Sequence, residues 1–181
     1  MQVVGIIVFC VLSAVVYGIV QDQVTARVCV EYFTLGHPPL FHTDDPTLLG
    51  LGGGVIATWW VGLLLGIPLA LVARAGQRPQ RAAVALVRPV LLLMAVTAVG
   101  TVIAGVIGWV LASNGLVVLL EPLASQVPRA KHVAFLADLW AHLASYGVGL
   151  VGGIVVMLSV WRARGRAMDR RAEPGGCSTS I

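Results

Sequence analysis

The sequence predicts an all-α membrane protein with four transmembrane helices. Hydrophobic residues make up 58% of the 181 residues and charged residues only 11%, whereas an ordinary soluble domain has about 25% charged residues. Twelve basic and eight acidic side chains cannot cover the surface of a soluble domain of this length. Disorder is excluded because it requires low hydrophobicity. Long uninterrupted apolar runs, in place of short alternating segments, exclude a β-barrel.

Four runs have the length of about 20 apolar residues that a helix needs to cross a membrane. They cover residues 3–20, 48–73, 90–112 and 139–161, and we assign them to one membrane domain, residues 1–171. Residues 172–181 are rich in Pro, Gly and Ser, which predicts a disordered tail. The first run lacks a basic start and an A-x-A-like cleavage site. We therefore expect it to remain as a helix, not to be removed as a signal peptide.

The charges between the spans predict the orientation in the membrane. The segment 21–50 has a net charge of −3, whereas the segments 74–88 and 162–181 have net charges of +4 and +3. Nine of the twelve basic residues therefore lie on one side, which positive charge marks as cytoplasmic. We expect both termini in the cytoplasm and a 30-residue outer loop.

The lipid bilayer is the expected partner, and nucleic acid is not, because no basic face with groove-entering elements is present.

Turn and cap residues place the ends of two helices. Asp44 and Asp45 precede Pro46, a combination typical of a capped helix with proline in its first turn. Pro128 is expected to begin a helix that continues into the fourth span. This outer extension would carry one face at helical spacing, made of His132, Phe135, Leu136, Leu139, His142, Leu143 and Tyr146.

Small residues recur at every fourth position of the second span, which allows helix backbones to approach closely in lipid. We favour packing inside one bundle over a homodimer interface or a contact with another membrane protein. Shorter series occur in the third and fourth spans. The three series are Gly50, Gly54, Thr58, Gly62, Gly66 and Ala70; Gly100, Ala104 and Gly108; and Ser145, Gly149 and Gly153.

Trp59 and Trp60 lie near the middle of the second span, although tryptophan usually lies at the membrane interface. Adjacent positions differ by about 100° on a helix, so one ring can pack inward while the other faces lipid or a neighbouring helix. We favour core packing over a ligand-binding role.

All four histidines are predicted on or near the outer side. Imidazole nitrogens with a nearby carboxylate could bind zinc or copper, so the candidate metal ligands are His37, His42, His132, His142 and Asp138. Asp138 and His142 are four residues apart and could form a hydrogen-bonded pair on one helix face. The spacing matches no tight ligand motif, and we favour capping and loop anchoring. No cofactor is predicted.

Other chemistry is poorly supported. Haem would need a second axial histidine in a span, and only His142 lies in one. The spans offer few ionisable groups for a transport pathway. No nucleophile elbow, phosphate-binding loop or dinucleotide fingerprint is present, so an enzyme is not favoured and no catalytic residue is assigned. The three cysteines form no redox pair, and Cys29 is expected to be a free thiol.

Four segments resemble a group of small, uncharacterised bacterial integral membrane proteins. The segments are Glu31–Pro39, Asp45–Leu49, Ala57–Ala70 (ATWWVG through GIPLA) and Asp138–His142. The resemblance covers the chain from the first loop to the fourth span. It implies a bacterial inner-membrane location and supplies neither an activity nor site residues.

The sequence favours a structural or partner-binding role in the bacterial inner membrane. The alternative is a protein that binds a metal or a redox cofactor through its outer histidines. The third hypothesis is that the protein is a small-molecule permease.

Overall fold

The computed structural model describes residues 1–38 and 42–172, and the side chains up to Arg170. Four long helices run along its length: α1 (Gln2–Val28), α3 (Pro46–Arg74), α4 (Val84–Ser113) and α6 (His132–Ala172). Three short elements lie in the connections. These are α2 (Glu31–Thr34) between α1 and α3, and α5 (Leu123–Gln126) and the 3-10 turn η1 (Arg129–Lys131) between α4 and α6. All four long helices have the length and hydropathy to cross a membrane. The chain is therefore an all-helical, multi-pass membrane protein.

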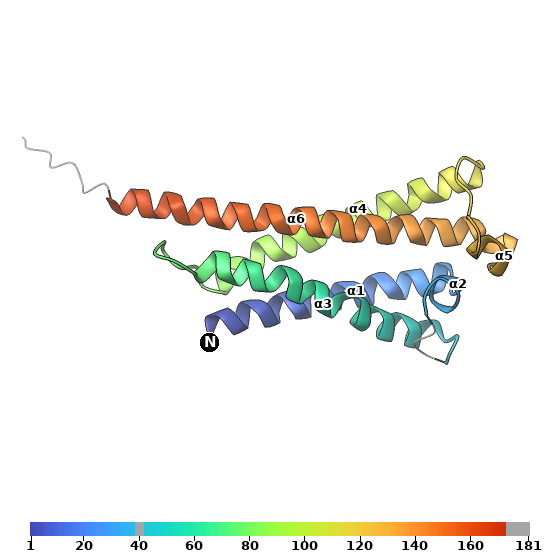
Figure 1. Ribbon diagram of the computed structural model, residues 1–181, viewed down its shortest axis with the longest axis horizontal. Helices are drawn as coiled ribbons and strands as arrows, with labels where there is room; N and C mark the ends of the chain where they lie inside the picture. Colours follow the sequence, from blue (N-terminus) through green and yellow to red (C-terminus); the bar gives the residue numbers. More distant parts are fainter. Residues whose placement is uncertain (39–41, 173–181) are drawn as a thin grey trace, which may run out of the picture.

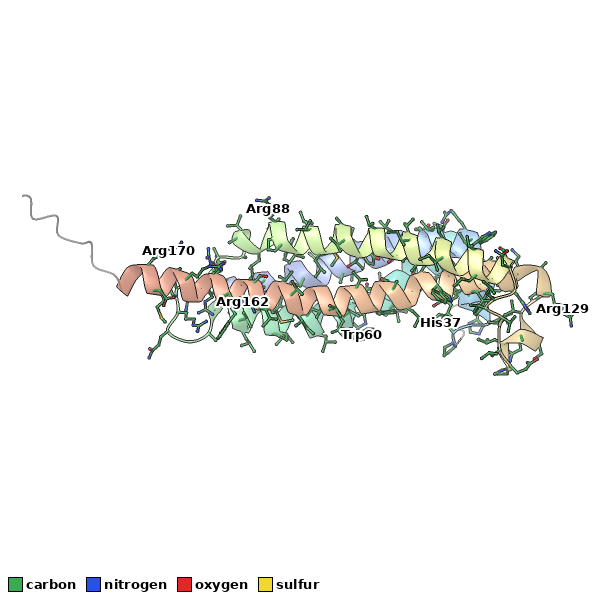
Figure 2. The ribbon with its side chains drawn as sticks, turned by 90° about the horizontal axis from the view of Figure 1, so that it is seen from above. His37, Trp60, Arg88, Arg129, Arg162 and Arg170 are labelled. Atoms are coloured by element: carbon green, nitrogen blue, oxygen red, sulfur yellow. The ribbon has the colours of Figure 1, made fainter. Side chains whose placement is uncertain are left out.

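The helices pack as two antiparallel pairs, α1 with α3 and α4 with α6 (Figure 1). The N-terminus, the loop 75–83 and the end of α6 lie at one end of the bundle, whereas α2 and α5 lie at the other. Figure 2 places Arg88, Arg162 and Arg170 toward the first end and His37 toward the second. We call them the arginine end and the histidine end. The tail predicted to be disordered lies, from residue 173 on, outside the described residues.

The first helix is longer than predicted. It continues eight residues beyond Val20, to Val28, so the connection to α3 is shorter than the expected 30-residue loop. Asp22, which was expected in that loop, lies in α1 and is buried. The apolar run ends at Val20, but the helix continues because it packs against the rest of the bundle. At α3 the prediction is confirmed, since the carboxylate of Asp45 accepts a hydrogen bond from the backbone N–H of Leu48 at 2.8 Å.

The small-residue face of α3 packs against α1 of the same chain. A Cβ atom on Gly54 would lie 2.5 Å from Cα of Ile19, and one on Gly62 would lie 2.5 Å from Cα of Val11. Real Cβ atoms do not approach a backbone so closely, so these positions require glycine. The predicted packing within one bundle is confirmed for this face.

Three hydroxyl groups connect the two helix pairs. The hydroxyl of Tyr17 on α1 lies 2.9 Å from Oγ1 of Thr101 on α4 and accepts a hydrogen bond from Ser145 on α6 at 3.2 Å. Polar side chains within a bundle are stable when they bond one another across helices. This small network fixes the register between the two pairs.

One buried arginine holds the arginine end together. The guanidinium of Arg164 on α6 donates hydrogen bonds to the carbonyls of Val72, Ala75, Arg78 and Pro79. The carbonyl of Val72 belongs to the last turn of α3, whose carbonyls a helix leaves without partners. The loop after α3 is therefore anchored to α6, and its Arg78 covers the ring of Trp161 at 4.0 Å.

The expectation of core packing for the central tryptophans is wrong, because neither ring is buried. Trp59 is 47% exposed and Trp60 is 46% exposed. The two rings leave the core because α3 turns its glycine face inward, toward α1. The ring of Trp60 instead stacks on Tyr146 at a centroid distance of 6.5 Å.

Candidate functional site: a cavity at the histidine end

A cavity of about 560 Å³ opens at the histidine end. Its walls come from α1, α2, α3, α6 and the segment before α3. The volume falls in the range of about 300–1,000 Å³ that is typical of small-ligand sites. The side chains that determine its chemistry are Asp22, Asp44, His37, His42, His142, Tyr32, Phe33, Trp60 and Tyr146.

The floor of the cavity contains a buried acid–base pair. Nε2 of His142 on α6 lies 3.1 Å from Oδ1 of Asp22 on α1, and their side chains are only 12% and 6% exposed. The second carboxylate oxygen of Asp22 lies beside Gly53, where a Cβ atom would approach it to 3.0 Å. Glycine at this position of α3 therefore makes room for the carboxylate.

Two hydrogen bonds orient the ring of His142. Its Nδ1 donates to the backbone carbonyl of Asp138 at 2.9 Å, because a carbonyl can only accept. This bond turns Nε2 toward Oδ1 of Asp22 on α1, so the ring connects α6 to α1.

The structure corrects the predicted pairing of Asp138 with His142. The two side chains are not bonded to each other, because the ring of His142 bonds the backbone of Asp138 and turns its other nitrogen toward Asp22. Asp138 is 5% exposed as a residue, and its Oδ2 is buried without a hydrogen-bond partner among the described residues. A second carboxyl group is thus held next to the first pair in a largely apolar surrounding.

The short helix α2 covers this pair with an aromatic side chain. Tyr32 is buried and stacks on His142, with centroids 4.6 Å apart. Its backbone carbonyl accepts a hydrogen bond from Nδ1 of His37 at 2.8 Å, and the ring of His37 packs edge-on against Tyr32. Burial raises the pKa of the Tyr32 phenol, so this side chain remains neutral.

The predicted free thiol, Cys29, lies behind α2 and is fully buried. Its Sγ donates a hydrogen bond to Glu31 at 3.3 Å. Burial, together with this bond and the charge of Glu31, raises the pKa of the Cys29 thiol to about 12. The thiol is therefore a packing group of this end and not a nucleophile.

The candidate metal ligands separate into two places. His37, His42 and His142 line the cavity. His132 lies elsewhere, where its Nε2 donates to the carbonyl of Val127 at 2.9 Å, as expected for loop anchoring. In residues 1–38 and 42–172, no group of three or more His, Cys, Asp or Glu side chains is arranged to hold a metal ion.

Sequence reasoning missed Asp22 and Trp60 as site residues. Asp22 lies four residues after Gly18, which contacts α3, and this spacing places both on one face of a continuing helix. This spacing could have identified Asp22 from the sequence, but only if the first helix had been expected to continue beyond its apolar run. Trp60 enters the site because it turns away from the glycine face of α3.

The cavity combines acidic and aromatic walls. Two carboxylates and four aromatic residues line it, and no lysine or arginine does so in the part of the chain that the structure describes. Asp44 and His42 are exposed, so the cavity is open to water beyond the end of the bundle.

Comparisons with protein-family models, with curated proteins and with solved structures found no match. The residues of the cavity are therefore the basis for a functional proposal.

Proposed function

We propose that this membrane protein binds a small organic cation in the cavity at the histidine end. The observation that carries the proposal is the buried Asp22–His142 pair at the floor of an aromatic cavity. Ionisable groups are costly within a transmembrane bundle, and where they occur they usually serve a function. Here two further acids, Asp44 and Asp138, lie at the same end.

The walls match the chemistry of an organic ammonium ion. Tyr32, Phe33, Trp60 and Tyr146 present aromatic rings, whose faces attract cations. The carboxylates of Asp22 and Asp44 provide the opposite charge. A cation inside the cavity would meet no fixed positive charge from a lysine or arginine among the lining residues that the structure describes.

Titration calorimetry of the purified protein in neutral detergent tests this proposal. The probe is benzyltrimethylammonium, and benzenesulfonate of similar size and opposite charge is the control probe. The cation is expected to bind at one saturable site, and the anion is not. Equal binding of both probes, or binding of neither, would contradict the proposal.

Two variants localise the binding. Asp22→Asn is expected to abolish the calorimetric signal, whereas Asp169→Asn, an exposed acid at the other end of the bundle, is expected to preserve it. The intrinsic fluorescence gives an independent readout. Trp60→Phe should remove the change that the probe causes, and Trp59→Phe should leave it, since Trp60 lines the cavity and Trp59 is outside its lining.

We infer that the cavity faces outward and that both termini are cytoplasmic, in the plasma membrane of a bacterium. The arginine distribution supports this orientation through the positive-inside rule. Fusions test it: green fluorescent protein at the C-terminus should fluoresce, and alkaline phosphatase inserted after Thr43 should be active. The reverse pattern would overturn the orientation and leave the ligand proposal intact.

Partner binding is the second candidate. The glycine face of α3 is occupied by α1, but a Cβ atom added to Gly147, an exposed glycine on α6, would have no other described residue within 4 Å. Another transmembrane helix could pack closely there. Chemical crosslinking in native membranes tests this role, and purification of an exclusively monomeric, uncrosslinked protein would count against it. Elemental analysis of the same sample tests the metal-binding alternative.

A further inference from the structure

A second cavity lies at the opposite half of the bundle, between α4 and α6. Its volume is about 510 Å³, and every lining residue is apolar except Arg81 and Ser159. It shares no lining residue with the cavity at the histidine end. An inference about it is thus independent of the proposed function.

This groove is continuous with the lipid-facing surface. Leu92 and Val96 on α4 and Val155 on α6 contribute to its walls and are 62%, 52% and 55% exposed. In a bilayer, such exposed apolar surface faces hydrocarbon, not water. Pro89 and the small residues Gly152 and Ala163 also line the groove.

A guanidinium group lies where the groove meets the arginine end. The structure gives Arg81 one side-chain hydrogen bond, a long one of 3.5 Å from Nη2 to the carbonyl of Ala163. A guanidinium has five N–H donors, so most donors of Arg81 are available. Arg164 and Arg78, by contrast, are committed to backbone carbonyls and to Trp161.

The surrounding charge is strongly positive. Arg74 at the end of α3, Arg78 in the loop after it and Arg162 on α6 belong to the same end. Asp169, near the end of α6, is the one acid of the described residues there. Arginine forks bind phosphate oxygens in bidentate geometry. A negative headgroup placed at Arg81 would therefore have complementary charge while its chain occupied apolar walls.

We propose that the groove between α4 and α6 binds one anionic phospholipid, with an acyl chain along Leu92, Val96 and Val155 and the phosphate on Arg81. The apolar walls require a lipid and not a free phosphate ion. The arginine at the mouth selects an anionic headgroup over a zwitterionic one.

Native mass spectrometry of the detergent-solubilised full chain tests the proposal, with phosphatidylglycerol and phosphatidylcholine of identical acyl chains as probes. Phosphatidylglycerol is expected to bind preferentially with one high-affinity site. Arg81→Gln should weaken this binding about tenfold, as expected for loss of a charged hydrogen bond. Arg88→Gln is the matched control, because Arg88 is exposed at the same end but does not line the groove.

A second variant tests the apolar half of the site. Val155→Trp fills the groove without changing charge and should displace the lipid, while Val151→Trp, one turn earlier on the exposed surface of α6 and outside the lining, should not. Excess inorganic phosphate should not compete. Equal losses in the Arg81 and Arg88 variants, equal binding of both lipids, or competition by phosphate would each overturn the proposal.

Discussion

The imidazole Nε2 of His142 lies 3.1 Å from the carboxylate Oδ1 of Asp22, although the two residues are 120 positions apart. The contact joins α6 to α1 and so links the two antiparallel helix pairs at the histidine end. It also places a buried carboxyl–imidazole contact at the floor of the cavity.

Removing one member of this pair should destabilise the bundle. Asp22→Asn or His142→Ala leaves the other group buried without its partner, which typically costs about 3 kcal/mol or more. The double variant should lose less stability than the sum of the losses in the two single variants. Thermal unfolding in detergent measures the stability of all three variants. Additive losses would show that the two side chains do not interact.

Gly54→Ala should disrupt the α1–α3 pair. The added methyl group would lie 2.5 Å from the backbone of Ile19, so a helix must move, at a cost of about 3 kcal/mol. Gly147→Ala is the control, since nothing lies within 4 Å of the added atom there. Thermal unfolding of the two variants should therefore differ clearly, and equal midpoints would refute the close crossing.

Arg164→Lys should loosen the loop after α3. Lysine keeps the charge but lacks the planar fork that reaches four carbonyls from Val72 to Pro79. Limited proteolysis of the detergent-solubilised protein should cut within residues 75–83 faster in this variant. The exposed neighbour Arg162→Lys serves as control, and equal cleavage of both variants would argue against the anchoring role.

Cys29 should resist alkylation in the folded protein. A thiol with a pKa of about 12 in place of 9.0 has about a thousandfold less thiolate at pH 8. The reaction should accelerate as pH rises and after unfolding in dodecyl sulfate. A variant with Cys10→Ala and Cys177→Ser isolates the response to iodoacetamide. Rapid labelling of the native protein at pH 8 would contradict the burial of this thiol.

Much of the fold follows from the sequence, because hydropathy alone determines the four spans. Glycine spacing likewise predicted close helix packing within one bundle, although it did not identify α1 as the partner of α3. The site was harder to predict, because its central pair depends on how two distant helices are placed. Asp138 lies one helical turn before His142 on α6 and was therefore the expected partner of its ring. The ring instead turns toward Asp22, which hydropathy had assigned to a loop.

The orientation of Trp60 was missed for a related reason. Periodicity separates the glycine face of α3 from the side that carries Trp60, but it does not show what the Trp60 side meets. The close approach of Ile19 to Gly54 turns the glycine face inward and directs Trp60 to the cavity.

The most direct test of the cation site is calorimetric titration of benzyltrimethylammonium into the wild-type protein, Asp22→Asn and Asp44→Asn. We expect one saturable site in the wild type, loss of binding in Asp22→Asn, and weaker binding in Asp44→Asn, whose exposed side chain can be changed without unfolding the bundle. Undiminished binding in both variants would contradict the assignment of the cavity as a cation site.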